Sequence, residues 1–405
     1  MSNTNLTIDM ITNEVQRIAH EKLSFIGTIN KQFDDSYGRE GAKIGSALRV
    51  RLPDQYSVTT GRVITAQDST EQQVTLTMAT QKHVAMRFNS AELFTDIDDF
   101  SRRKIQPAVS TLISDVENDV LQGCTKLVAQ VAGTAGSAIT SLATPGAARA
   151  KLNQQLAPKD GNRCIQADSI TMGGIVDGLK GLFQDSAQIK EQYREGMMGR
   201  TAMADWYENE RCWTLGVTAD VSGGTLNSYT ITNGDSDLTV TGITTTPALG
   251  MVFTIAGVYD CHPETKAAYS HLKQFTLITT ASQTTFTISP AIYYTGPRKN
   301  VAGATGADIV PADLTTAALV FVGSASTNYV QPLMYHRDAF AFVTGELPLM
   351  AGADRCVRKT VEGVSLRVWT DSDIRNDEQI TRIDILYGYQ AIRPQWACRM
   401  IGAAN

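Results

Sequence analysis

Residues able to perform catalysis or bind metal are few and scattered in this 405-residue chain. The five histidines are His20, His83, His262, His271 and His336, and the six cysteines are Cys124, Cys164, Cys212, Cys261, Cys356 and Cys398. No HxxxH or HExxH spacing puts two zinc ligands on one helix face, and no CxxC pair occurs. We therefore expect buried free thiols and no metal site.

The densest cluster of reactive residues is Cys261-His262-Pro263-Glu264. Neighbouring residues point in different directions in a strand or loop, whereas catalytic partners usually meet from distant positions. An exposed turn is therefore favoured over a site. An enzyme that uses Cys261 and His262, or Cys356, is the weakest functional hypothesis.

The glycine and aspartate motifs also lack the spacing of known sites. Gly173-Gly-Ile-Val-Asp-Gly178 and Gly38-Arg-Glu-Gly41 contain neither GxGxxG nor a GK[ST] ending, so turns or helix starts are expected. Asp96, Asp98 and Asp99 precede a predicted helix, where capping is favoured over cation binding. We predict no catalytic, cofactor-binding or metal-binding residue, and no cofactor.

Composition narrows the class of protein. The chain is 42% hydrophobic and 19% charged, which is too apolar for a disordered chain. Its net charge is −5, from 36 basic and 41 acidic residues. This balance argues against a sequence-specific nucleic-acid-binding protein, but it suits a container that encloses nucleic acid without binding it tightly. The start lacks the features of a secretory signal, and no apolar run approaches a membrane span, so we expect no membrane association.

Two local basic patches stand out against this acidic balance. One is Arg102-Arg103-Lys104, and the other consists of Arg39, Lys43, Arg49, Arg51 and Arg62. Three interpretations stay open: solvated faces, salt bridges between subunits, or weak contact with a polyanion.

Hydrophobic periodicity predicts the elements of the amino-terminal part. A helix is expected over 7–24 and an extended arm over 32–45. Period-two alternation predicts strands over 48–52, 62–65 and 74–78, with a polar turn over 66–71 between the last two. A long spine helix follows over about 100–132, in which Pro107 is tolerable only in the first turn or at a kink.

Composition changes after Trp213. The preceding segment is mixed, with a helix expected near Met172–Phe183. Residues 214–330 carry only 11 charged residues but 23 threonines, and they alternate in short β patterns. Asn233-Gly234 predicts a hairpin between Tyr229–Thr232 and Leu238–Val240. We predict an inserted all-β barrel or sandwich. The chain then returns to longer strands over 340–343, 364–369 and 381–387.

The order of these elements resembles the Hong Kong 97-type capsid fold of tailed bacteriophages, and the β insert narrows the resemblance to P22-like coat proteins. Three segments carry it: Arg102-Arg-Lys-Ile-Gln106 at the start of the spine helix, Gly250-Met-Val-Phe-Thr-Ile-Ala-Gly-Val258 with Leu272-Lys-Gln-Phe-Thr-Leu277 in the insert, and Leu386-Tyr-Gly-Tyr-Gln-Ala-Ile-Arg-Pro394 at the end.

The resemblance implies an α+β fold with five parts. They are an N-terminal arm (1–45), an E-loop (46–80), a P-domain (81–132 and 355–385), an A-domain (133–215, 328–354 and 386–405) and an inserted β-barrel-like I-domain (216–327). The function implied is that of a major capsid protein of the Caudoviricetes, which assembles into an icosahedral shell around double-stranded DNA. The alternative is another virion structural protein, from the tail or head decoration.

Two further expectations concern assembly. Residues 44–81 contain no lysine, so the E-loop lacks an amine for a covalent cross-link and a non-covalent shell is predicted. About 45 residues precede the E-loop, which is short for a fused scaffolding segment. The expected partners are other copies in hexamers and pentamers, a separate scaffolding protein, a portal protein and packaged DNA held without specificity. Whether a decoration protein binds is left open. The expected location is the virion, after synthesis in the host cytoplasm.

Overall fold

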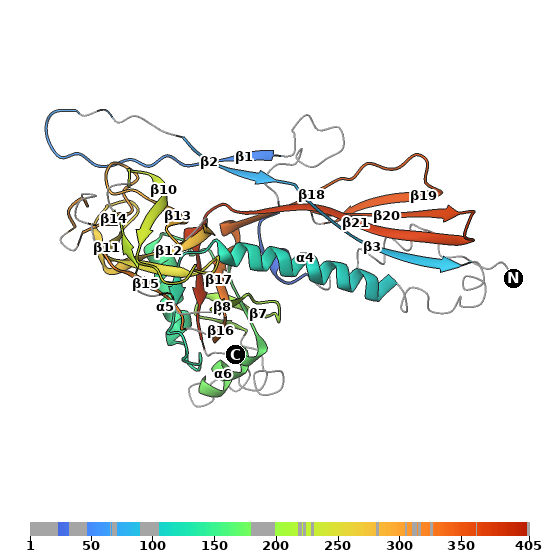
Figure 1. Ribbon diagram of the computed structural model, residues 1–405, viewed down its shortest axis with the longest axis horizontal. Helices are drawn as coiled ribbons and strands as arrows, with labels where there is room; N and C mark the ends of the chain where they lie inside the picture. The colour runs from blue at the N-terminus through green and yellow to red at the C-terminus, as the bar shows by residue number, and fades with distance from the viewer. Residues whose placement is uncertain are drawn as a thin grey trace. The chain divides into compact units, whose positions relative to one another are not determined.

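The structure is a computed structural model, and its elements are labelled in Figure 1. It describes residues 23–31, 47–64, 66, 71–89, 105–179, 199–217, 221, 224–227, 231–280, 283–303, 306–309, 314, 317–324, 327–361 and 363–402. Several sequence predictions lie outside these residues: most of the helix over 7–24, the arm over 32–45 with Gly38–Gly41, the aspartates 96–99, and Arg102-Arg103-Lys104.

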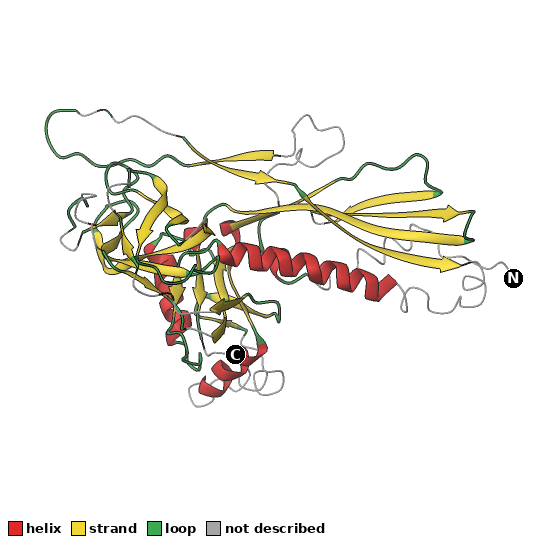
Figure 2. Cartoon of the chain, viewed as in Figure 1, coloured by secondary structure: helices red, strands yellow, loops and turns green. Residues whose placement is uncertain are grey.

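The chain forms two compact units of mixed helix and sheet, coloured by secondary structure in Figure 2. Unit 1 comprises Met1–Arg51, Gln73–Val120 and Phe340–Ile392. Unit 2 comprises Leu52–Gln72, Leu121–Ala339 and Arg393–Asn405. Each unit is described separately below.

Unit 1 is built on a five-stranded antiparallel sheet. Its strands are β18 (Phe340–Gly345), β21 (Glu378–Ala391), β20 (Val364–Asp373), β19 (Arg355–Val361) and β3 (Thr80–Asn89). The long strand β21 pairs with β18, β20 and β3. These strands include all three that the sequence predicts near the carboxyl terminus, so those predictions are confirmed.

Helix α4 (Gln106–Lys126) is the predicted spine helix, but it is shorter than the predicted 100–132. Pro107 is the second helical residue, where its missing N–H breaks no helical hydrogen bond. The prediction is wrong at the carboxyl end because apolar spacing continues beyond the helix: Val131 is buried as part of strand β4 (Val131–Ala132). Burial in a strand and burial in a helix produced the same local pattern.

The E-loop contains two paired strands, β1 (Ala47–Leu52) and β2 (Gln72–Thr77). The predicted strand over 62–65 is wrong for the residues described, because Arg62, Val63 and Ile64 are exposed and lie outside any strand. Strand β1 is the partner of β2, so the loop between them is longer than the predicted turn. Alternation of residue types therefore did not identify a strand where the segment had nothing to pair with.

Unit 2 contains a six-stranded sheet in the order β4-β22-β17-β5-β7-β6. Besides β4, the strands are β22 (Ala397–Met400), β17 (Leu333–His336), β5 (Arg163–Ala167), β7 (Ala204–Glu208) and β6 (Arg200–Thr201). Helices α5 (Ala143–Gln154) and α6 (Ser169–Leu179) contribute Leu152 and Ile175 to the core shared with this sheet.

The motif Gly173–Gly178 lies inside α6, so its assignment to a turn or helix start is wrong. Close packing explains the glycine at 178: a Cβ there would lie 1.6 Å from the carbonyl oxygen of Thr140.

We expect Gly178→Ala to destabilise unit 2 by roughly 2 kcal/mol, because the helix must move away from this backbone. Urea unfolding would measure the loss, and Gly173→Ala is the matched control because no atom lies within 4 Å of its Cβ position. Equal stability of both variants would contradict the argument.

In the region of the predicted insert, unit 2 contains a closed β-barrel whose strands lie between Thr225 and Phe321. Neighbouring strands run β11 (Val252–Cys261), β12 (Ala268–Thr280), β13 (Thr285–Ile292), β10 (Asp235–Thr241) and β9 (Thr225–Leu226). The closing strand is β15 (Leu319–Phe321): it pairs with β11, and residues at its start bond to the β9 segment through Leu226 N to Ala317 O and Leu319 N to Gly224 O, both at 2.9 Å. The predicted all-β insert is therefore a barrel.

Two details of the insert refine the sequence prediction. Asn233-Gly234 forms a turn, with Asp235 N donating to Thr232 O at 3.1 Å. Before this turn, β9 pairs antiparallel with β10, with Leu226 opposite Val240 and Thr225 opposite Thr241, which is the order that a hairpin turning at Asn233-Gly234 requires. Tyr229 and Thr230 of the predicted first strand lie outside the described residues. The chain enters and leaves the insert through an antiparallel neck, β8 (Thr214–Val217) with β16 (Thr327–Val330).

Candidate assembly surfaces and their supporting clusters

The E-loop presents apolar side chains without a core of its own. Along β1 the burial alternates, with Arg49 and Arg51 exposed and Leu48 and Val50 half-buried. Three aliphatic side chains in the following loop are almost fully exposed: Val58 (95%), Val63 (85%) and Ile64 (92%). A two-stranded ribbon with such a loop is marginal in water, so this segment is suited to dock on another surface.

Helix α4 is tied to the sheet of unit 1 by a charged cluster. Lys82 Nζ lies 2.7 Å from Asp115 and 3.8 Å from Asp119, and Tyr387 donates its hydroxyl proton to Asp119 at 2.5 Å. Burial and the neighbouring carboxylate of Asp119 raise the pKa of Tyr387 above its ordinary value. Lys82, the first lysine after residues 44–81, is thus engaged within its own unit.

The opposite face of this sheet carries a buried carboxylate between two arginines. Asp384 accepts a bond from Arg367 Nη2 at 2.6 Å and from Arg382 Nε at 2.5 Å. Both guanidinium groups also lie within 6 Å of the Trp369 ring centroid, at 5.3 and 5.9 Å. These contacts stiffen β20 and β21, whose connecting turn projects the exposed Ile374.

Residues 24–30 are bound to unit 1 by the buried carboxylate of Glu117. It accepts four hydrogen bonds: from Ser24 N to both oxygens at 3.2 and 3.0 Å, from Ser24 Oγ at 2.7 Å and from Phe25 N at 3.1 Å. Phe25 is fully buried and packs on Phe340 with 5.8 Å between ring centroids. Glu117 therefore fixes the point from which the chain preceding Ser24 departs.

Arg399 joins four parts of unit 2 and is fully buried. Its guanidinium donates to the carbonyls of Lys126 at the end of α4 and of Val128 just after it. It also donates to Gly250 O and Thr276 Oγ1 of the insert and to Gln331 Oε1 beside the neck. All these acceptors are neutral oxygens. Burial lowers the pKa of Arg399 to about 9, so it is still a cation at neutral pH.

Gly250 is required where the insert meets Arg399. Its φ of +79° is a backbone conformation that L side chains rarely adopt. A Cβ there would also lie 2.7 Å from the Trp213 ring. The glycine that opens the segment Gly250–Val258 thus has a packing role.

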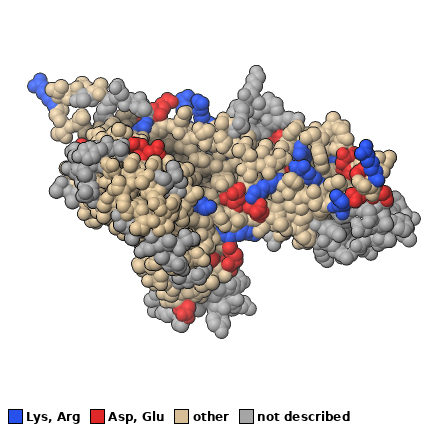
Figure 3. Space-filling view, viewed as in Figure 1, with Lys and Arg blue, Asp and Glu red and all other residues tan. Residues whose placement is uncertain are grey.

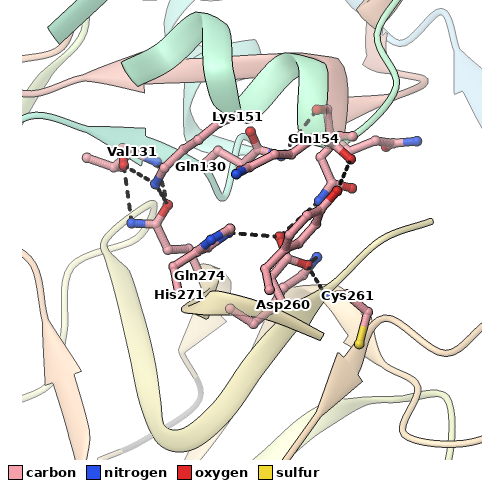
Figure 4. A network of polar contacts seen from close by, with 12 residues as sticks. Gln130, Val131, Lys151, Gln154, Asp260, Cys261, His271 and Gln274 are labelled. Atoms are coloured by element: carbon pink, nitrogen blue, oxygen red, sulfur yellow. Dashed lines mark hydrogen bonds and ion pairs between the residues drawn. The ribbon is translucent and has the colours of Figure 1, made fainter. Parts of the chain in front are cut away.

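A second polar cluster connects the insert to α5, as Figure 4 shows. Lys151 Nζ donates to Val131 O and to Gln274 Oε1, both at 2.5 Å. Asp260 accepts from Lys273 at 2.7 Å and from Gln155 at 2.9 Å. A cavity of about 50 Å³ lies among these side chains, a volume that suits one or two waters.

The charges of this cluster make its stability pH-dependent. Burial opposes ionisation of Asp260, but the charge of Lys273 and hydrogen bonds from His271 and Lys273 outweigh it and lower the pKa of Asp260. A carboxyl whose folded pKa lies below its unfolded value, about 4, stabilises the fold above that pH. We expect this contribution to be lost as the pH falls below about 4.

Unfolding midpoints of the wild type and of Asp260→Asn between pH 2 and 7 would measure this effect. The variant should be less stable at neutral pH, and its difference from the wild type should shrink towards pH 2. Asp237→Asn, an exposed aspartate on the same barrel, is the control. A constant difference across the range would contradict the assignment.

Most residues singled out in the sequence are not gathered into a site. Cys261 is buried at the end of β11, and burial raises the pKa of its thiol, which makes it a poor nucleophile. His262 Nδ1 accepts bonds from Glu264 N and Thr265 N at 3.2 Å, so it stabilises the predicted turn. Cys356 is half-buried in β19. In the described part of the chain no three His, Cys, Asp or Glu side chains are grouped to hold a metal ion.

Sequence inspection missed the residues that organise the structure: Glu117, Arg399, Asp260 and Ile374. Glu117 carried one available signal, since it lies among the apolar positions of a helix face. Arg399 carried a similar signal in an otherwise apolar strand, Ala397–Met400. Of the helices described, none is long and apolar enough to cross a bilayer.

Comparison with known proteins shows a family match over part of the chain and a structural likeness over most of it. Residues 213–402 match the family described as P22 coat protein, gene protein 5. A structure from Mycobacterium phage Che8 superposes with a TM-score of 0.52 at 10% identity, covering 93% of this chain and 90% of that one. The sequence matches no curated protein.

Weaker structural likenesses are found to the capsid of Ralstonia phage GP4 and to that of cyanophage P-SCSP1u. The first has a TM-score of 0.45 at 7% identity and covers 95% of this chain and 92% of that one. The second has a TM-score of 0.43 at 11% identity and covers 95% and 91%.

The fold is thus the Hong Kong 97-type fold, and residues 213–402 are similar to the P22 coat protein family. The resemblance to P22-like major capsid proteins is confirmed, with the family match over residues 213–402. Both family and fold are structural rather than enzymatic.

Proposed function

We propose that this chain is the major capsid protein that self-assembles, as hexamers and pentamers, into the icosahedral head of a tailed bacteriophage around double-stranded DNA. The observation that carries the proposal is the E-loop: paired strands with no core of their own and three nearly fully exposed aliphatic side chains. In a shell each copy supplies such an arm and receives one, so the apolar surface is buried repeatedly.

The E-loop would lie on the P-domain of a neighbouring copy, and the N-terminal arm would reach across a subunit boundary. The absence of lysine from residues 44–81 and the engagement of Lys82 by Asp115 support a shell without covalent E-loop cross-links. The insert would support the A-domain through Arg399 and the cluster around Asp260.

The charge distribution supports a container for DNA. Net charge is −5, and few charged side chains cover the insert on the face seen in Figure 3. The proposed partners are further copies of the chain, a separate scaffolding protein and a portal protein, with DNA held by proximity alone. No catalytic activity is proposed. The protein would be made in the host cytoplasm and end in the virion shell.

Electron microscopy of the expressed chain, alone and with scaffolding extract from the phage, tests the proposal. Closed shells or polyheads of uniform wall thickness are expected, and boiling in SDS should return a 43.9 kDa monomer. Monodisperse monomers in both samples would contradict the coat assignment, and narrow tubes of fixed diameter would favour a tail component. Covalent ladders after boiling would contradict the non-covalent shell.

A further inference from the structure

Asn233-Gly234 is the only Asn-Gly pair in the chain, and such a pair can modify itself covalently. The backbone nitrogen of the glycine attacks the side-chain carbonyl carbon of the asparagine, an approach that the missing Cβ of glycine leaves unhindered. The bond between this nitrogen and Cγ forms, the bond between Cγ and Nδ2 breaks, and the side-chain nitrogen leaves as ammonia with the proton that the glycine nitrogen loses. Water then opens the cyclic imide to give isoaspartate or aspartate.

The fold withholds the nucleophile of this reaction. Gly234 N donates to Ile292 O at 2.8 Å, where strand β10 begins to pair with β13. The Tyr293 ring lies beside the glycine, since a Cβ on Gly234 would be 2.9 Å from Cε1 of that ring. Attack requires Gly234 N to leave its acceptor and turn towards Asn233 Cγ. The hydrogen bond and the ring both oppose this rotation.

The electrophile is held by three hydrogen bonds. Asn233 Oδ1 accepts from Tyr294 N at 3.0 Å and from Thr295 N at 3.3 Å, and Nδ2 donates to Thr295 O at 3.3 Å. The two N–H groups polarise the amide carbonyl, which taken alone favours attack. The three bonds also fix the orientation of the side chain, so it cannot follow the glycine nitrogen without losing them. The amide is thus activated while its attacker is restrained.

A second asparagine holds the segment that binds Asn233. Asn300 Oδ1 accepts from Tyr293 N at 3.0 Å, and its Nδ2 donates to Ala291 O at 2.8 Å. The backbone N–H of Asn300 also donates to Tyr293 O at 2.9 Å. Because Asn300 is followed by Val301, it lacks the unhindered nitrogen that makes an Asn-Gly pair reactive. This clamp restrains the Tyr293 ring and the neighbouring N–H groups together.

We propose that Asn233-Gly234 is a latent deamidation site, which the closed turn protects and which forms isoaspartate only when this end of the barrel opens. The reaction is a one-way record of opening, because isoaspartate adds a methylene group to the backbone and a negative charge to the turn. The hydrogen bonds from Gly234 N to Ile292 O and from Asp235 N to Thr232 O then no longer fit the lengthened chain. The inference requires only this fold, and it holds whether or not the chain assembles.

Ageing the full chain in mildly alkaline buffer, once native and once unfolded in urea, tests the proposal. Peptide mapping by mass spectrometry would follow a gain of about 1 Da at the pair, and an isoaspartate methyltransferase would count the isoaspartate. The native chain should react roughly tenfold more slowly or less, because its rate follows the open population. Asn233→Gln should abolish the signal in urea. Equal rates in the two states, or no isoaspartate in either, would overturn the proposal.

Two variants loosen the native turn without changing the pair itself. Tyr293→Ala removes the ring beside Gly234, and Asn300→Ala removes the clamp. Each should raise the native rate several-fold and leave the rate in urea unchanged, and thermal melting would verify that both variants fold. Thr285→Ala, at an exposed position of β13, is the matched control and should leave both rates unchanged. Wild-type native rates in both folded variants would overturn the protection assigned to the turn.

Discussion

Replacing Arg399 by methionine should lower the free energy of unfolding of unit 2 by about 3–5 kcal/mol, the largest effect expected of any single substitution in this chain. Methionine restores much of the volume but donates no hydrogen bond. The carbonyls of Val128 and Gly250, which the guanidinium now satisfies, would be left buried without that donor. Because these acceptors belong to the backbone, no side-chain repacking can remove them.

Urea unfolding of the unassembled chain would measure this loss, and hydrogen exchange would locate it. Protection should fall at β22, at the end of α4 and at the insert residues near Gly250 together, since one side chain serves all three. Arg399→Lys should recover only part of the loss, because the ammonium group of lysine cannot reproduce the planar arrangement of N–H donors in the guanidinium group. Arg355→Met, at an exposed arginine of β19, is the matched control. A loss confined to β22 would contradict the role assigned to Arg399.

The role of Arg399 could not be predicted from sequence for a physical reason. Its acceptors come from residues 126, 128, 250, 276 and 331, which are far apart along the chain and mostly backbone atoms. Every residue type carries a backbone carbonyl, so the sequence does not show which carbonyls accept a hydrogen bond from Arg399. A buried carboxylate partner would at least have offered an opposite charge to look for, as Asp260 does for Lys273.

Elements in which apolar residues recur at one regular spacing along the sequence were predictable. Strands β10, β11, β12 and β13 alternate because the barrel has one packed interior, and this is why the insert was evident from threonine-rich alternation. The pattern failed at Val63 and Ile64, which alternate with polar residues yet are covered by nothing in their own chain. In the proposed shell such a segment would pack on a neighbouring copy, and the alternation within one chain does not identify the surface that would cover it.

The spine helix illustrates a related limit. Pro107 was expected to be tolerable only in the first turn or at a kink, and it is the second residue of α4. The end of the helix was not predictable, because Lys126 O and Val128 O are satisfied by a residue some 270 positions away. Where a helix ends by tertiary contact instead of a capping residue, periodicity overestimates its length.

Glu117→Gln should release residues 24–30 from unit 1 at a cost of about 3 kcal/mol. The carboxylate now accepts bonds from Ser24 N, Ser24 Oγ and Phe25 N. A glutamine keeps one acceptor oxygen and places an NH2 group among these donors, so at least one buried N–H loses its partner. Phe25 and Ile26 would then leave the core, and their apolar burial would be lost with the hydrogen bonds.

Hydrogen exchange of Ser24–Asn30 and urea unfolding would measure both consequences. Exchange of this segment should rise by two orders of magnitude or more, which is what a loss of about 3 kcal/mol implies when opening is local. Asp115→Asn is the control, since Asp115 is largely exposed on the same helix and its ion pair with Lys82 is worth about 1 kcal/mol or less. If the segment stays protected in Glu117→Gln, the buried apolar contacts of Phe25 and Ile26 hold it without the carboxylate, and the anchor assigned to Glu117 is wrong.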